Sequence, residues 1–152
     1  MIYLVVSVVI FNVVAYFIPK RITKLEMYAT SIFALFFANL IDLFLEHKYL
    51  LYWYFNKEVD WISLIVFFGT YPAINIMVLN FFPLDARYSK KITYIALWSL
   101  FLTFYEWGAV NIGEFLHYGK WNIWYSLLLY PVIVTILYWN FMLIRRLSKS
   151  SK

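Results

Sequence analysis

The chain has 152 residues and a formal net charge of +5, and 64% of its residues are hydrophobic. Soluble domains are about 45–50% apolar, and a fold of this size has too much surface to hide such an excess. The absence of cysteine excludes disulfides and thiolate chemistry. With two histidines and no spacing typical of a metal motif, we expect neither a metal nor a cofactor. The composition predicts one transmembrane domain that spans residues 1–152.

Five apolar segments follow one another along the chain, at 1–18, 27–46, 61–82, 92–110 and 124–144. A spanning helix needs about 20 mostly apolar residues, so the predicted fold class is all-α, a polytopic transmembrane helical bundle of about five helices. The first segment lacks a basic start and a small-residue cleavage site, which favours a helix over a signal peptide. Because Asn12 is its one clearly polar residue, this helix is typical of one that faces lipid or another subunit, and the sequence leaves open whether it packs with the two hairpins or stands apart.

The basic residues are unevenly divided between the two sides of such a bundle. With five spans, ten of them fall on the side of the C-terminus, and Lys48, Lys57 and Lys120 fall on the other. Cytoplasmic loops carry the excess of Lys and Arg, so the pattern predicts an N-terminus outside and a C-terminus in the cytoplasm. Juxtamembrane basic clusters face anionic lipid, which argues against nucleic acid as a partner. The ten residues are Lys20, Arg21, Lys24, Arg87, Lys90, Lys91, Arg145, Arg146, Lys149 and Lys152.

The two outer loops, 47–60 and 111–123, are rich in aromatic residues and partly charged. One interpretation is an aromatic belt at the level of the lipid headgroups, where Trp and Tyr are enriched. The other is a lid over a pocket that faces outward. The sequence leaves both open.

Residues 27–83 and 92–144 have a similar plan and are candidates for a repeated two-helix hairpin. Each begins with a helix that carries a carboxylate near its outer end, passes a loop with His and Lys, and enters a helix with a Tyr-Pro step followed by Asn-Phe. Two hairpins of this kind insert with the same orientation, which makes a parallel repeat; chance likeness between aromatic hairpins is the alternative. The matched residues are Asp42 and Glu106, His47 and His117, Lys48 and Lys120, Pro72 and Pro131, and Asn80 and Asn140.

Pro72 and Pro131 are predicted to kink their helices, because proline removes a backbone hydrogen bond and crowds the preceding turn. A matched pair of kinks would splay the two helices and open a cavity between them. Packing alone is the alternative, since proline is common in membrane helices.

Two carboxylates lie inside the predicted spans, where an ionisable group is costly and indicates function. At 1.5 Å per residue, Asp42 lies roughly 22 Å from the start of its segment and Glu106 roughly 21 Å from the start of its own. Both reach the outer third of the membrane. We therefore expect them to approach each other, and to move protons, hold a cation or act as general acid and base.

Polar residues at helical spacing accompany the carboxylates and predict one intramembrane site. The alternative is structural, because such groups also link membrane helices by hydrogen bonds or reach the interface. The catalytic residues are unknown, and the sequence has no nucleophile motif, P-loop, dinucleotide fingerprint or zinc motif. The predicted polar site consists of Asn39, Asp42, Glu46, Tyr71, Asn75, Thr103 and Glu106.

Four stretches carry a resemblance to known families: KYLLYWYF, VDW, YPAINIMVLNFFP and EWGAVNIGEFLHYGKWNIWYS. They resemble an uncharacterised family of small multi-pass membrane proteins of Gram-positive bacteria, which implies a cell-membrane location and no particular activity. Glu106 and GKWNIWYS are also similar to the small membrane-embedded lycopene cyclases. The acidic and Pro-x-Glu signatures of those enzymes are missing here, so this second likeness is an analogy.

Three functions remain open. The first, which the short loops favour, is a non-enzymatic accessory or interaction protein of the bacterial cell membrane. The second is a proton- or cation-coupled small transporter that uses the two carboxylates, and the third is a membrane enzyme acting on a lipophilic substrate by acid–base chemistry. The expected partners are the lipid bilayer and, as an open alternative, other membrane proteins.

Overall fold

The computed structural model describes residues 1–58 and 61–150. The described chain is mainly helical and contains the five expected helices, so the all-α prediction is confirmed. Lys152, and Val59 and Asp60 of the VDW stretch, lie outside the described residues. In chain order the elements are α1 (Ile2–Phe17), α2 (Lys24–Asp42), the π-helix η1 (Leu43–Lys48), β1 (Tyr52–Tyr54), α3 (Ser63–Asn80), α4 (Tyr88–Asn111), β2 (Leu116–Tyr118) and α5 (Ile123–Ser150).

Within the described residues, three helical segments are long and apolar enough to cross a membrane: Lys24–Lys48, Ser63–Asn80 and Ile123–Ser150. The apolar helix α1 has 16 residues and is shorter than these. Although α4 has 24 residues, its tyrosines, tryptophans and Glu106 lower its hydropathy. Length and composition therefore support membrane insertion most directly for α2, α3 and α5.

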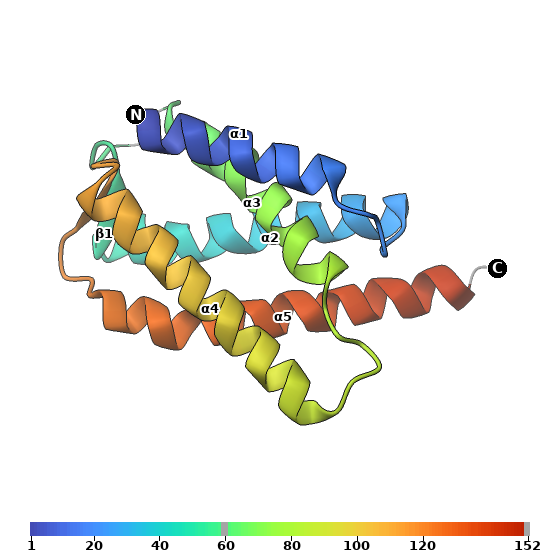
Figure 1. The fold of residues 1–152 in the computed structure, drawn as a ribbon. Helices are drawn as coiled ribbons and strands as arrows, with labels where there is room; N and C mark the ends of the chain where they lie inside the picture. The colour runs from blue at the N-terminus through green and yellow to red at the C-terminus, as the bar shows by residue number, and fades with distance from the viewer. Residues whose placement is uncertain (59–60, 151–152) are drawn as a thin grey trace.

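The helices form one bundle with its two ends clearly distinct (Figure 1). The N-terminus and the two strands lie at one end, and the C-terminus lies at the other. At the C-terminal end, Thr23 Oγ1 accepts a hydrogen bond from the Glu26 amide at 3.2 Å, and Glu26 Oε2 accepts one from the Thr23 amide at 2.7 Å. This capping box starts α2. Arg145 Nε of α5 donates to Glu26 Oε1 at 2.6 Å, which joins α5 to α2.

Helix α1 packs on the bundle along one face. Leu4, Phe11 and Ala15 are buried on that face, and Asn12 Nδ2 donates to the Gly69 carbonyl of α3 at 2.7 Å. The close approach depends on glycine, since a Cβ at Gly69 would lie 2.9 Å from a methyl of the Val8 side chain. The sequence left open whether α1 packs with the rest of the bundle, and the structure shows that one of its faces packs against α3.

The outer loops form a short antiparallel ribbon, which the sequence analysis did not predict. Tyr52 pairs with Tyr118, Trp53 with His117, and Tyr54 with Leu116. Since side chains alternate along a strand, the middle pair stacks on one face of the ribbon, with ring centroids 6.0 Å apart. The outer two pairs face the bundle. We call residues 52–54 and 116–118 the cap ribbon.

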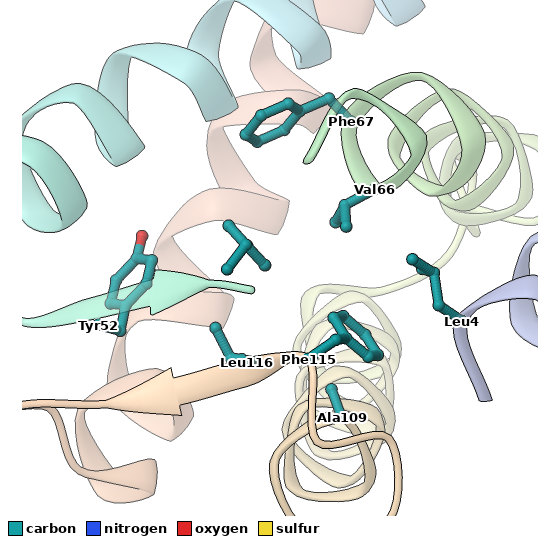
Figure 2. Close-up of a cluster of buried hydrophobic side chains, with 8 residues drawn as sticks. Leu4, Tyr52, Val66, Phe67, Ala109, Phe115 and Leu116 are labelled. Carbon is teal, nitrogen blue, oxygen red and sulfur yellow. The ribbon is translucent and has the colours of Figure 1, made fainter. Parts of the chain in front are cut away.

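The cap ribbon closes a hydrophobic cluster at this end of the bundle. Figure 2 shows Tyr52 of β1 and Leu116 of β2 among side chains of the helices, including Leu4 of α1, Val66 of α3 and Ala109 of α4. These residues are all buried. The aromatic loops are therefore part of the packed fold, with only one face of the ribbon turned away from the bundle.

Candidate functional site

A cavity of about 190 Å³ lies between α2, α3, α4 and α5, next to the cap ribbon. Most of the lining side chains are apolar, among them Ala34, Val66, Leu102 and Val134. Two carboxylates interrupt this lining, Asp42 and Glu106, together with tyrosines and an asparagine. The site is therefore an apolar chamber with a small number of fixed polar groups, as is usual for small-molecule sites.

Glu106 of α4 is held by three hydroxyl groups. Its Oε1 accepts hydrogen bonds from Tyr118 of the cap ribbon at 2.5 Å and from Ser126 of α5 at 2.6 Å. Its Oε2 accepts one from Tyr130 of α5 at 2.5 Å. Trp121 Nε1 in turn donates to Ser126 Oγ at 2.7 Å. The carboxylate thus joins α4, α5 and the ribbon, and both of its oxygens have partners.

Asp42 of α2 has a different environment. Its Oδ1 accepts a hydrogen bond from Tyr52 of the cap ribbon at 2.5 Å. Its Oδ2 is buried and has no hydrogen-bond partner among the described residues, and the residue is only 5% exposed. Asp42 is also the last residue of α2 before the π-helix η1, and π-turns are frequent at functional sites. An open acceptor in a buried setting is costly unless a donor reaches it.

The ribbon tyrosines remain hydrogen-bond donors because of their surroundings. Burial, followed by the nearby Asp42 carboxylate, raises the pKa of Tyr52 above its usual value. Burial and the hydrogen bond to Glu106 raise the pKa of Tyr118 in the same direction. Both hydroxyls are therefore protonated at neutral pH, and each ties one strand of the ribbon to one helix.

Asn75 of α3 provides a second open acceptor, deeper in the bundle. Its Nδ2 donates to Thr30 Oγ1 at 3.0 Å, and Thr30 donates its own hydroxyl proton to the Glu26 carbonyl at 2.7 Å. Because that proton is used, Thr30 can only accept from Asn75, which fixes the amide orientation. Asn75 Oδ1 is then left buried without a partner among the described residues.

The two Tyr-Pro steps both bring their tyrosine to the cavity. Tyr71 precedes Pro72 inside α3, and Tyr130 precedes Pro131 inside α5. The Tyr71 hydroxyl lies 3.0 Å from the Tyr54 hydroxyl of the cap ribbon. The two helices thus contribute equivalent residues to one chamber, whatever the origin of the likeness.

The structure separates the predicted polar residues into two groups. Asp42, Tyr71, Asn75 and Glu106 all line the cavity. Asn39, Glu46 and Thr103 are not among its lining residues.

Asn39 and Thr103 bond to their own helices. Asn39 is exposed, and its Nδ2 donates to the Leu35 carbonyl at 2.8 Å. Thr103 Oγ1 donates to the Ser99 carbonyl at 2.8 Å. Such bonds to the carbonyl four residues earlier satisfy a polar group within its own helix, so helical spacing alone did not identify the residues that reach the chamber.

Glu46 also lies away from the chamber, because the chain changes from an α-helix to a π-helix before it reaches this residue. It is buried in the π-helix η1, and its Oε1 accepts from the Tyr54 amide at 3.1 Å. With Asn39 and Asp42 it lines a separate groove near the start of α3. The predicted stripe of Asn39, Asp42 and Glu46 assumed a regular α-helix, whereas the wider π-turn rotates Glu46 relative to the first two.

Sequence reasoning missed the hydroxyl donors Tyr52, Tyr118, Ser126 and Tyr130. The available signal was a tyrosine shortly after each carboxylate, in an aromatic outer loop. Reading these loops as a lid would have pointed to the ribbon, whereas reading them as an interfacial belt did not. No group of three or more His, Cys, Asp or Glu side chains that could hold a metal ion occurs in the described part of the chain.

Comparisons with protein-family models, with curated proteins and with solved structures find no match to this chain.

Proposed function

We propose that the protein is a multi-pass membrane protein of the bacterial cell membrane, with five spans, the N-terminus outside and the C-terminus in the cytoplasm. Three long apolar helices support insertion. The N-terminus and the cap ribbon lie at one end of the bundle and the C-terminus at the other, which agrees with the direction that the basic residues favour. Under this arrangement the chamber lies in the outer half of the membrane, beneath the ribbon.

Within that setting we propose a non-enzymatic role, in which the protein holds one slender lipophilic molecule in the chamber. This proposal rests on the shape and chemistry of the cavity lining. It extends along α3 from Val66 to Val78, about 18 Å at 1.5 Å per residue. Along α5 it extends from Ser126 to Leu137, about 17 Å by the same rise. A long, narrow, mostly apolar space suits a single chain better than a compact polar substrate.

The state of Glu106 argues against acid–base catalysis as the main role. Its oxygens accept three hydrogen bonds from the protein, which use most of the acceptor sites of a carboxylate and hold it as a link between helices. A proton- or cation-responsive transporter is the second candidate, and the open Oδ2 of Asp42 favours it. A lone open oxygen is a poor cation site, however, because such ions take several oxygen ligands.

The test is to fill the chamber and measure what the protein carries. Ala34 lines the cavity and is buried, whereas Ala96 lies exposed on α4 away from it. The wild type, Ala34→Leu and Ala96→Leu are purified from membranes, and bound lipophilic molecules are extracted and quantified by mass spectrometry. We expect a molecule in stoichiometric amount in the wild type and in Ala96→Leu, and its loss from Ala34→Leu. Equal content in all three, or none in the wild type, would remove the proposal.

The parallel repeat of 27–83 and 92–144 also remains a proposal. It is supported by the two Tyr-Pro steps at one cavity and by the two carboxylates that each accept from a cap-ribbon tyrosine. Since Tyr52 pairs directly with Tyr118, a twofold axis along the membrane normal would pass near this pair. An experimental structure in which the two prolines lie at different depths after superposition of α2 on α4 would argue for chance likeness.

A further inference from the structure

We propose that the molecule in the chamber is a single-chain amphiphile with a hydrogen-bond-donating, non-anionic head group, a primary amine or an alcohol, and that this head group binds Asp42 Oδ2 beneath the cap ribbon. This inference rests on the proposed function and adds the chemistry of the ligand. Four features of the chamber carry it.

The first feature is the open acceptor itself. Asp42 is 5% exposed and its Oδ2 has no protein donor among the described residues. The neighbouring Oδ1 is already bonded to Tyr52, which holds the side chain in place. A fixed, desolvated oxygen gains most from a ligand donor, because without one its desolvation cost remains uncompensated.

The second feature is the sign of the charge around it. Among the described residues that line the chamber there is no Lys, Arg or His, whereas there are two carboxylates. Of the donors near Asp42, the Tyr52 hydroxyl bonds to Asp42 and the Trp121 indole bonds to Ser126. The Tyr105 hydroxyl of the lining has no partner among the described residues, but it is neutral and cannot balance the charge of an anion. A carboxylate or phosphate head group would therefore meet like charge with no cation to balance it, whereas an ammonium or hydroxyl group would meet an acceptor.

The third feature is the direction in which a chain would run. Asp42 lies at the ribbon end of the chamber, and Asn75 is anchored to Thr30, twelve residues earlier on α2, which corresponds to about 18 Å at 1.5 Å per residue. Between these levels the wall is formed mainly by apolar side chains such as Ala34, Ile74 and Leu137. A head group at Asp42 therefore sends its chain along the bundle axis, away from the ribbon.

The fourth feature is the division between the two carboxylates. Glu106 accepts from three protein hydroxyls, whereas Asp42 accepts from one. The two acids lie at comparable positions at the same end of the bundle, so the difference assigns the ligand contact to Asp42 and a structural role to Glu106.

The experiment uses three photoactivatable probes with the same mid-chain diazirine, based on dodecylamine, dodecanol and dodecanoic acid. Each is added at the same mole fraction to the full-length protein in nanodiscs, and the labelled peptides are mapped by mass spectrometry after illumination. We expect the amine and the alcohol to label lining peptides of α3 and α5 at least about tenfold more than the acid, since one hydrogen bond to a charged group is enough for such a ratio. Ala34→Leu should reduce labelling by all three probes.

Asp42→Asn tests the head-group contact directly. The single amide oxygen can still accept from Tyr52, and the amide NH2 group that replaces Oδ2 can donate to the oxygen of an alcohol but finds no acceptor on an ammonium group. Labelling by the alcohol should therefore persist and report an intact chamber. Labelling by the amine should fall toward that by the acid, because the carboxylate charge is gone. The matched variant Asp85→Asn makes the same change on an exposed loop residue and should leave all three ratios unchanged.

The outcomes separate the two proposals. If the acid labels the lining as strongly as the amine, or if Asp42→Asn keeps the preference for the amine, the head-group inference is overturned while the chamber remains a lipophile site. If no probe labels the lining peptides above the lipid-facing ones, and Ala34→Leu changes nothing, the proposed function itself fails.

Discussion

Removing one hydroxyl group from the cap ribbon should have unequal effects on its two strands. Tyr52→Phe and Tyr118→Phe delete the same atom from directly paired residues and leave both rings in place. The Tyr52 hydroxyl is the donor that the structure gives to Asp42, whereas Glu106 receives the Tyr118 hydroxyl and two others. The two substitutions therefore differ in what they leave behind.

The magnitudes follow from this difference. Tyr52→Phe leaves a carboxylate that is 5% exposed without its tyrosine donor, and an unsatisfied buried group of this kind costs about 2–3 kcal/mol. After Tyr118→Phe, Glu106 still accepts from Ser126 and Tyr130, so the loss is that of one ordinary hydrogen bond, about 1 kcal/mol. We expect Tyr52→Phe to be the more destabilising variant by about 1–2 kcal/mol.

Reversible unfolding in mixed micelles, followed by tryptophan fluorescence and circular dichroism, measures the free energies of unfolding. Tyr49→Phe is the matched control, because Tyr49 lies in the same loop and is largely exposed; it should change the free energy by less than about 0.5 kcal/mol. The reasoning would be contradicted if the two substitutions lowered the free energy of unfolding equally, or if Tyr118→Phe lowered it more. Either result would mean that the number of donors to each carboxylate does not set the cost.

Three further predictions concern the rest of the bundle. The chain has no cysteine, so a cysteine introduced at Lys57 should react with an impermeant reagent from outside intact cells and one at Tyr88 only after permeabilisation; the reverse would overturn the proposed orientation. Glu26→Gln should lower the free energy of unfolding by about 1.5–3 kcal/mol, because it removes the charge that Arg145 bonds, and an unchanged value in micelle unfolding would refute this. Gly69→Leu should cost about 1–3 kcal/mol by forcing α1 away from α3, and a protease-resistance profile equal to that of the wild type would contradict it.

Much of the helical scaffold was predictable because it depends on long apolar runs. The segments 61–82 and 124–144 correspond closely to α3 and α5. The end of the segment 27–46 was not predictable, because hydropathy does not distinguish a π-helix from an α-helix, and the chain changes from one to the other after Asp42. The ribbon was missed for a related reason, since strands of three residues are too short to establish an alternating pattern.

The site was predictable only as far as depth along a helix determines position. Asp42 and Glu106 could be placed at matched levels from helix rise alone, and both line the cavity. It was harder to predict which side of a helix faces the cavity. Thr103, for example, bonds to the Ser99 carbonyl of its own helix α4 and does not line the cavity. For the tyrosines of the ribbon, the sequence offered a lid as one interpretation of their loops. Their contacts with the carboxylates could not be predicted, because these depend on how two loops far apart in the sequence pair with each other.

The two carboxylates explain why residue type and position along a helix are weak guides to the role of an acid inside a helical bundle. An acid inside a bundle must be satisfied, and the donors can come from the protein or from a ligand. Glu106 accepts hydrogen bonds from three protein hydroxyls and joins α4, α5 and the ribbon. Both of its oxygens therefore have donors from the protein. Asp42 receives one hydroxyl, its buried Oδ2 has no donor among the described residues, and the residue lines the apolar chamber. A buried acid without a donor is costly, so Asp42 is the residue that gains from contact with a bound molecule. Glu106 already has its donors in the protein, and its hydrogen bonds help to hold the chamber in shape.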